Sequence, residues 1–158
     1  VTDELTGLTN RHGLHKAFQS ELERAHRYQR PLTVILVDID HFKAVNDELG
    51  HLMGDKVLVE FARLLKSGVR QVDTVCRWGG EEFLIICHET PPDQAMELAE
   101  WLLQAVHRHA FACGRPITAS AGVASAVGGD SALTIEARAD AALYQAKTTG
   151  RDRVCLAT

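Results

Sequence analysis

A pair of adjacent glycines between two β-prone runs constrains the fold of this chain more than any other feature. The stretch from Val75 to Ile86 reads VCRWGGEEFLII, with Gly79 and Gly80 at its centre. The pattern predicts a tight β-hairpin with both glycines in the turn, because type I′ geometry requires positive φ at both central residues. The chain should therefore contain at least one antiparallel strand pair.

Two carboxylates, Glu81 and Glu82, follow these glycines directly. Adjacent carboxylates repel each other and are costly to desolvate, so a cation or a proton donor beside them would account for the pair. The alternative is a solvated turn with two exposed charges. The short motif by itself does not decide between these interpretations.

Length and charge narrow the class of protein. A chain of 158 residues suits one domain, residues 1–158, with one sizeable core. The longest apolar runs, Leu32 to Val37 and Phe83 to Cys87, are too short to span a bilayer. Because the first residues lack the features of a signal peptide, we expect a cytoplasmic segment, with membrane attachment of a longer parent chain left open. The net charge of −4 gives no global reason to bind nucleic acid.

The cysteines and histidines do not indicate a disulfide framework or a zinc site. Eight histidines are present without zinc-ligand spacing. The four cysteines form no CxxC pair and are expected to be free thiols in a reducing compartment. They are Cys76, Cys87, Cys113 and Cys155.

Hydrophobic periodicity predicts a mixed α/β domain. The expected order is helix, strand, two helices, hairpin, helix, strand, helix, strand, and its core is βααββαβ with a mostly antiparallel sheet. A polar and glycine-containing link over residues 51–55 is expected between the second and third helices. The expected helices span about residues 11–27, 41–49, 56–68, 91–108 and 134–147, and the other strands about residues 32–38, 117–126 and 153–156.

One strand is expected in the middle of the sheet, because residues 32–38 (LTVILVD) are almost wholly apolar. It runs directly into Asp38-Ile39-Asp40. A hairpin beside this strand would bring Asp38 and Glu81 to neighbouring strand ends, which is plausible geometry for a metal site. Asp40 could support that site, or it could cap the helix that starts near His41.

Five sequence blocks, in order and at matching spacing, resemble the conserved blocks of the GGDEF family of diguanylate cyclases. The resemblance covers essentially the whole chain and implies a bacterial signalling enzyme that condenses two GTP into cyclic di-GMP and two pyrophosphates. It also implies a ferredoxin-like fold similar to the palm of cyclases and polymerases, with an extra N-terminal helix. The blocks are DELTGLTNR (3–11), DIDHFKAVND (38–47), GH-x-x-GD (50–55), GGEEF (79–83) and ALYQAKTTGRDRV (142–154).

The resemblance assigns metal and catalytic roles. The implied metal ligands are Asp38, the backbone carbonyl of Ile39, and Glu81, holding two Mg²⁺ per active site, with Mn²⁺ as a substitute. Two such ions would stabilise the attacking and leaving oxygens when a ribose 3′-hydroxyl attacks an α-phosphorus. Glu81 is the residue usually credited with activating that hydroxyl. Lys43 and Glu82 are further candidates for the catalytic group.

The resemblance also assigns contacts to GTP. Asn46 and Asp55 match positions that bind the guanine base, where paired polar contacts would reject adenine. His51 either lies beside them or is a loop histidine or helix-cap contact. The phosphates would contact the cations Lys43, Lys147 and Arg151 and the backbone N–H groups of His41, Phe42 and Lys43 at a helix start. For any single one of these cations, a solvated surface position is the alternative.

A second nucleotide site is implied by Arg70 and Asp73, which match the RxxD motif of the family's product-inhibition site. A guanidinium can bind a guanine edge or a phosphate, and a carboxylate can accept guanine N–H groups. By itself RxxD usually marks an exposed ion pair. A further arginine is usually needed, and the sequence does not identify it.

Two other classes of function stay open at this level. The chain could be a catalytically weak receptor for GTP or cyclic di-GMP, although its acidic cluster and guanine contacts are intact. A ferredoxin-like RNA-binding module is the second alternative, which the acidic balance argues against. For the enzyme, the two-fold symmetry of the product predicts a homodimer as the active species. Because regulatory and dimerising domains are expected upstream, we expect weak activity from this segment alone.

Overall fold

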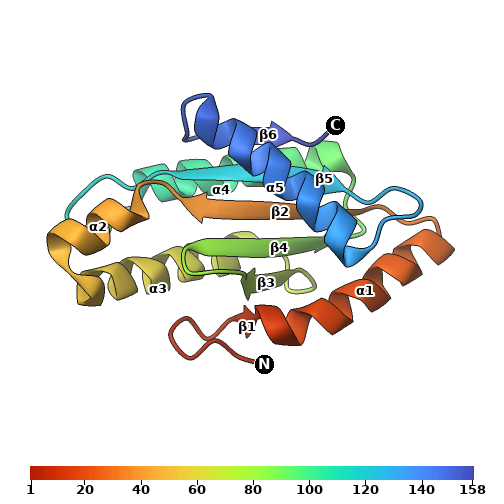
Figure 1. Cartoon of the computed structure of the whole chain (residues 1–158), viewed down its shortest axis with the longest axis horizontal. Helices are drawn as coiled ribbons and strands as arrows, with labels where there is room; N and C mark the ends of the chain where they lie inside the picture. The colour runs from red at the N-terminus through yellow and green to blue at the C-terminus, as the bar shows by residue number, and fades with distance from the viewer.

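The computed structural model describes all 158 residues as a six-stranded sheet covered by helices on both faces (Figure 1). The strand order is β1-β3-β4-β2-β5-β6. The helices are α1 (Arg11–Arg27), α2 (Phe42–Leu49), α3 (His51–Gly68), α4 (Pro92–Arg108) and α5 (Ala132–Thr148). The strands are β1 (Thr9–Asn10), β2 (Leu32–Ile39), β3 (Thr74–Arg77), β4 (Glu82–His88), β5 (Ala119–Ser125) and β6 (Val154–Leu156).

The sheet is mostly antiparallel, as the sequence predicts. Strand β2 lies in the middle and pairs antiparallel with both β4 and β5, and β3 and β4 form the hairpin. Parallel pairs occur only at the two edges, where β1 joins β3 and β6 joins β5. The two-residue strand β1 was not predicted, because so short a strand carries no periodic signal.

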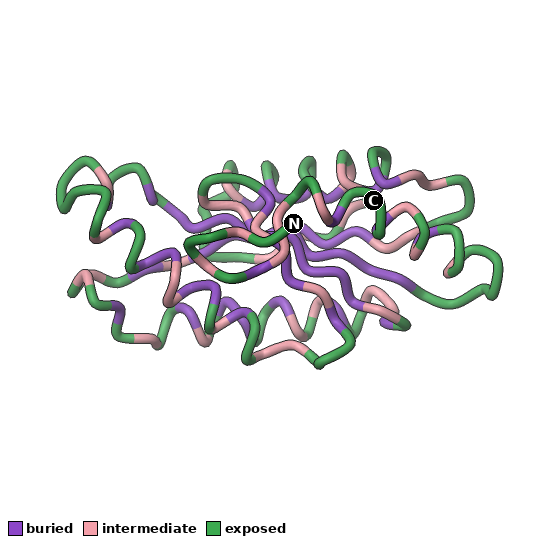
Figure 2. The backbone as a smooth tube through the Cα atoms, turned by 90° about the horizontal axis from the view of Figure 1, so that it is seen from below, coloured by how far each residue is buried: buried purple, intermediate pink, exposed green.

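The apolar run of β2 is explained by burial on both of its faces. Because side chains alternate along a strand, Ile35 and Val37 pack against α3 and α4, whereas Val34 and Leu36 pack against α1 and α5. Figure 2 shows the same layering, with buried strands between helices whose outer turns are exposed. The two hydrophobic cores, one on each face of the sheet, therefore determine the face on which each β2 side chain is buried.

Helix α5 lies unusually close to the sheet at Gly122 of β5. A Cβ atom at this glycine would lie 2.2 Å from the carbonyl oxygen of Ala139 and 2.4 Å from the backbone nitrogen of Leu143. No side chain fits in that space, so glycine permits the helix to rest directly on the strand. This close approach brings the C-terminal turn of α5 within reach of the end of β2.

The hairpin differs from the type I′ turn that the sequence predicts. Neither Gly79 nor Gly80 has positive φ. The backbone N–H groups of Trp78 and Gly79 both donate to the carbonyl oxygen of Glu82, at 2.8 Å and 3.1 Å. The loop is therefore longer than two residues and includes Glu81, which becomes a turn residue.

The link predicted over residues 51–55 is wrong, because helix α3 already begins at His51. Gly54 lies inside this helix and donates its N–H to the carbonyl of Gly50 at 3.1 Å. A Cβ atom at Gly54 would lie 1.9 Å from the Oδ1 atom of Asn46 in α2. The glycine therefore allows close packing of two helices, and its low helix propensity is overridden by this contact.

Other local predictions are confirmed. Asn10 caps α1 by accepting a hydrogen bond from the N–H of Gly13 at 2.9 Å. All four cysteines are free, and burial raises the pKa of the Cys76 and Cys87 thiols to about 12, which keeps them protonated and unreactive. None of the helices combines the length and the apolar character that a membrane crossing requires.

Candidate active site

The predicted carboxylates meet at the C-terminal end of β2. Asp38 lies opposite Glu82 of β4 and Ser120 of β5 in the sheet register. The N–H of Ile39 donates to the carbonyl oxygen of Glu81 at 3.3 Å. Pairing of β2 with the hairpin therefore brings together the acidic residues that the sequence predicts at neighbouring strand ends.

The hairpin loop that carries Glu81 is held by an arginine. Arg77 donates from Nη2 to the carbonyl oxygen of Gly80 at 2.8 Å and from Nε to the same oxygen at 3.2 Å. The same guanidinium pairs with Asp3 at 3.2 Å. Arg77 thus ties the hairpin loop to the N-terminal segment. The Glu81 side chain forms no ion pair within the loop.

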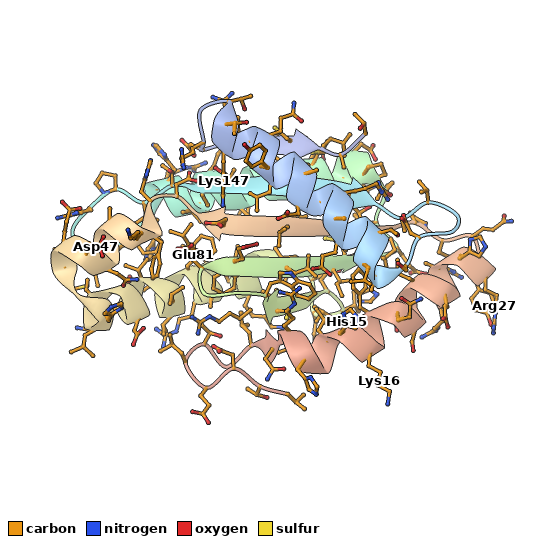
Figure 3. The ribbon with its side chains drawn as sticks, viewed as in Figure 1. His15, Lys16, Arg27, Asp47, Glu81 and Lys147 are labelled. Carbon is orange, nitrogen blue, oxygen red and sulfur yellow. The ribbon has the colours of Figure 1, made fainter.

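The cluster receives one direct cation, Lys147 from the last turns of α5. Its Nζ atom lies 2.6 Å from Oδ2 of Asp38, whose side chain is 5% exposed. Figure 3 shows Lys147 and Glu81 at the same end of the sheet, one from α5 and the other from the hairpin loop. A residue late in the chain therefore completes a site built from the middle strands.

Negative charge is nevertheless in excess. Burial raises the pKa of Asp38, against the opposing effect of Lys147. Burial and then the neighbouring charge of Asp38 raise the pKa values of Glu81 and Glu82. Three carboxylates that are each harder to ionise than usual, with one paired lysine, form an environment that a multivalent cation would relieve.

The donor set suits a hard divalent cation that keeps other ligands. No group of three or more His, Cys, Asp or Glu side chains is arranged as a preformed metal cage. Two carboxylates and a backbone carbonyl are fewer oxygens than a closed Ca²⁺ site uses, but Mg²⁺ is usually bound by one or two carboxylates together with phosphate and water oxygens. The residues present fit that second pattern.

The alternative that Asp40 caps α2 is wrong. The N-cap of α2 is His41, in a left-handed conformation with φ 55°, and no side chain caps this helix. The Asp40 carboxylate instead accepts hydrogen bonds from Thr118 Oγ1 and Ser120 Oγ, each at 2.7 Å, and from the N–H of Asp152 at 3.1 Å. It is a saturated and buried acceptor.

The residues predicted to contact the guanine base lie on α2 and α3. The Asn46 side chain of α2 contacts Gly54 of α3, the residue before Asp55. His51 is exposed at the start of α3 and is neither a loop residue nor a side-chain cap. Lys43 is highly exposed, with Asp47 4.0 Å away.

The backbone N–H groups expected to bind phosphate lie where predicted, at the start of α2. The chain leaves β2 at Ile39 and α2 begins at Phe42, so this helix N-terminus follows the strand that carries Asp38. The N–H groups of a first helical turn lack intrahelical acceptors and favour anions. Arg151, which follows α5, is exposed, and its positive charge partly offsets the rise in the Asp38 pKa that burial causes.

The RxxD residues lie at the opposite end of the sheet. The Asp73 side chain is 1% exposed and accepts from the backbone N–H and the guanidinium of Arg70 and from the N–H of His88. The Arg70 guanidinium also contacts Thr90 Oγ1 and the carbonyl of His88, yet its side chain is 55% exposed. It lines a groove of about 780 Å³. The charged residues that line it are Arg24, Arg30 and Arg70, together with Glu21 and Glu89.

Sequence reasoning missed three residues that shape the active-site end of the sheet. Thr118 and Ser120 of the β5 segment bond Asp40, and Arg77 fixes the hairpin loop. For Thr118 and Ser120, the only signal in the sequence was hydroxyl residues at alternate positions in an otherwise small and apolar segment. Their partner, Asp40, could not be predicted, because it lies about eighty residues away in the sequence.

A family model described as "Diguanylate cyclase, GGDEF domain" matches residues 1–153. The chain is 43% identical to the diguanylate cyclase DgcP of Pseudomonas aeruginosa and 43% identical to the response regulator PleD of Caulobacter vibrioides. Each match covers 98% of this chain but only 23% of DgcP and 35% of PleD. The chain thus spans about a quarter to a third of the length of these curated relatives.

Solved structures share the fold over nearly the full chain. The active GGEEF domain of a diguanylate cyclase from Vibrio cholerae superposes with a TM-score of 0.91 at 40% identity, covering 96% of this chain and 98% of that one. The coiled coil and GGDEF domain of DgcB from Caulobacter crescentus, in complex with c-di-GMP, gives a TM-score of 0.92 at 31% identity and covers 99% of this chain and 85% of that one.

Proposed function

Because the chain belongs to the diguanylate cyclase GGDEF domain family, we propose that it condenses two GTP into cyclic di-GMP and releases two pyrophosphates. The observation that carries this proposal is the cluster of Asp38, Glu81 and Glu82 beside Lys147, at the strand ends where the family's acidic blocks meet. Burial, and after it the neighbouring charge of Asp38, raise the pKa values of Glu81 and Glu82, and a substrate-bound divalent cation would offset both effects.

The metal ligands in this proposal are the Asp38 and Glu81 carboxylates and the Ile39 carbonyl. Bound there, Mg²⁺ or Mn²⁺ would supply charge stabilisation for the attacking 3′-hydroxyl and the departing pyrophosphate. Glu81 is unpaired within its loop, so its carboxylate is available to accept a proton or to approach a cation. Glu82 faces Asp38 directly and is the weaker candidate for either role.

The remaining residues would bind GTP. Asn46 and Asp55, on neighbouring helices, would present an amide and a carboxylate to one guanine edge, with His51 beside them. The phosphates would extend toward the cations Lys43, Lys147 and Arg151 and the N–H groups of Phe42 and its neighbours at the start of α2. Before substrate binds, Lys147 neutralises Asp38, so we expect substrate and metal to replace that contact.

A homodimer is the proposed active species, since one such site holds one GTP and the product joins two. The reaction rate per protein chain should therefore fall on dilution. A specific rate that stays constant over about a hundredfold dilution would contradict this part of the proposal, because a pre-formed complete site does not depend on encounter.

Product inhibition through Arg70 and Asp73 is a separate part of the proposal. Burial of Asp73 supports a division of roles in which Asp73 holds Arg70 and the exposed guanidinium faces the groove. An anionic dinucleotide could also contact Arg24 and Arg30, which line this groove beside Glu21 and Glu89. Arg70→Ala should raise the cyclic di-GMP concentration needed for half inhibition and leave initial rates without product unchanged.

The deciding experiment incubates the domain at high concentration with GTP and Mg²⁺ and separates the products by chromatography, with Glu81→Gln alongside. We expect cyclic di-GMP from the wild type and none from the variant. If neither protein forms product but the wild type binds cyclic di-GMP and Arg70→Ala removes that binding, a receptor domain is favoured. If neither protein forms product and neither GTP nor cyclic di-GMP binds, the proposed function is overturned.

A further inference from the structure

The segment that carries Arg151 has an unusual backbone. Between the end of α5 at Thr148 and the start of β6 at Val154, three successive residues have positive φ: Gly150 at 131°, Arg151 at 62° and Asp152 at 49°. Residues with side chains rarely adopt this region, and two in succession are disfavoured unless surrounding contacts impose them. We name residues 149–153 the Arg151 loop.

One buried carboxylate supplies the main contact that imposes this conformation. The N–H of Asp152 donates to Asp40 Oδ2 at 3.1 Å and to Ser120 Oγ at 3.2 Å. The Ser120 hydroxyl itself donates to Asp40 Oδ1. At its start the loop is tied to α5, because the N–H of Arg151 donates to the carbonyl of Ala146 at 2.9 Å.

Asp40 is well suited to this task because it is itself held rigidly. It is 5% exposed, its N–H donates to the carbonyl of Thr118 at 2.9 Å, and its carboxylate accepts from the hydroxyls of Thr118 and Ser120. A carboxylate with three fixed donors cannot turn toward a metal ion without abandoning them. Asp38 and Asp40 lie on the same face at the end of one strand, but their surroundings differ. Asp40 accepts three hydrogen bonds, whereas Asp38 has one lysine partner.

We infer that Asp40 is a positioning residue for the proposed cyclase reaction, which holds the Arg151 loop so that the Arg151 guanidinium faces the GTP phosphates. This inference rests on the proposed function for its ligand, the triphosphate. Asp40 acts through the backbone of Asp152 and not on substrate. If the loop moved, the Arg151 guanidinium would turn toward solvent and lose its contact with the phosphates. The affinity for GTP would then fall although the positive charge is still present.

The test compares Asp40→Asn with the wild type by calorimetric binding of 3′-deoxy-GTP, which cannot cyclise, and of GMP, both with Mg²⁺. The asparagine keeps the size of the side chain but replaces one acceptor oxygen with a donor. We expect about tenfold weaker binding of 3′-deoxy-GTP and an unchanged affinity for GMP, which lacks the β- and γ-phosphates. Equal weakening of both nucleotides would overturn the inference.

A double-mutant cycle separates positioning of Arg151 from a general structural effect. In an Arg151→Ala background, Asp40→Asn should change the 3′-deoxy-GTP affinity by less than about twofold, because the group it positions is gone. An undiminished tenfold loss in that background would show that Asp40 acts on the site by another route. Ser120→Ala, which removes the other acceptor of the Asp152 N–H, should give the same pattern with smaller changes and serves if Asp40→Asn does not fold.

Amide hydrogen exchange measures the contact without any ligand. The Asp152 amide should exchange slowly in the wild type and markedly faster in Asp40→Ala, which removes both acceptor oxygens, while amides of the central strand β2 are unchanged. Equal exchange in both proteins would overturn the inference. If the wild type bound no GTP, the proposed function would fail, and this measurement would still decide whether Asp40 holds the loop.

Discussion

At one end of the central sheet Asp73 accepts hydrogen bonds from two backbone N–H groups and one guanidinium, and at the other end Asp38 has a single lysine partner and two carboxylate neighbours. Both side chains are almost fully buried, at 1% and 5% exposure. Their burial is alike, so the difference lies in the supply of donors.

That difference separates a structural carboxylate from one available for chemistry. A buried carboxylate with all its acceptors satisfied stabilises the fold and has little to gain from a ligand. A buried carboxylate beside like charges keeps unused acceptor capacity, and a cation or substrate can improve its situation. Asp73 is the first kind, and the Asp38 cluster is the second.

The largest expected contrast is in catalysis. Asp38→Asn should lower the rate of cyclic di-GMP formation by at least about 100-fold, because it removes a proposed metal ligand. Asp73→Asn should change the initial rate by less than about twofold, since it lies at the far end of the sheet. Initial rates measured with product removed enzymatically check both values, and similar losses in the two variants would break the comparison.

The effects on stability should have the reverse order, with a larger loss from substitution of Asp73 than from substitution in the Asp38 cluster. Asp73→Ala should reduce the free energy of unfolding by about 2 kcal/mol, because it leaves the partly buried backbone N–H groups of His88 and Arg70 without an acceptor. Arg70→Ala is the control, with a smaller loss of at most about 1 kcal/mol because its side chain is half exposed. Urea unfolding followed by circular dichroism provides the values. An Arg70→Ala loss as large as the Asp73→Ala loss would contradict the assignment.

Removal of Lys147 should expose the charge imbalance of the other cluster. Lys147→Met should cost about 1 kcal/mol at neutral pH, because the buried Asp38 charge loses its only ion-pair partner. Loss of the lysine raises the Asp38 pKa further, so the cost is full above that pKa and shrinks as the pH falls and Asp38 becomes protonated. Urea unfolding over a series of pH values measures this dependence, and a pH-independent cost would indicate lost packing instead.

The smallest expected effect is a gain in stability. Glu82→Gln should stabilise the metal-free protein by about 0.5 kcal/mol, because Glu82 and Asp38 are like charges directly opposite in an antiparallel pair. Glu23→Gln, on the exposed surface of α1, is the control and should change nothing measurable. Thermal unfolding in the presence of a chelator compares them. Destabilisation by Glu82→Gln would mean that this end of the sheet is not short of positive charge.

Much of the fold was predictable because its signals are local. The apolar run of β2, the helical spacing in α1, α3 and α4, and the glycines that end α2 and α3 each report on their own segment. The failures occurred where one specific contact, which the hydrophobic pattern does not report, decides the local structure. Gly54 reads as a helix breaker until the Asn46 side chain that contacts it is known, and the GGEE turn reads as two residues until Glu82 is seen to accept two N–H groups.

The candidate site divides in the same way. Asp38, Glu81, Asn46, Asp55, Lys147 and Arg151 were identified from sequence blocks, and no such block identified a partner for Asp40. Its partners come from Thr118 and β5 and from the segment after α5, at separations of 78 to 112 residues. Hydrogen bonds over such separations depend on strand order, which local patterns do not specify.

The amino-acid sequence by itself determined which residues are acidic, where apolar and polar residues alternate, and where the chain turns. It therefore determined which chemistry is available. Only the tertiary structure decided which of those carboxylates are satisfied. Asp38, Asp40 and Asp73 are the same residue type and all are buried, yet Asp40 and Asp73 have their acceptors filled and Asp38 does not. The physical reason is that the free energy of a buried charge depends on donors brought to it by packing, and packing joins segments that are distant in the sequence.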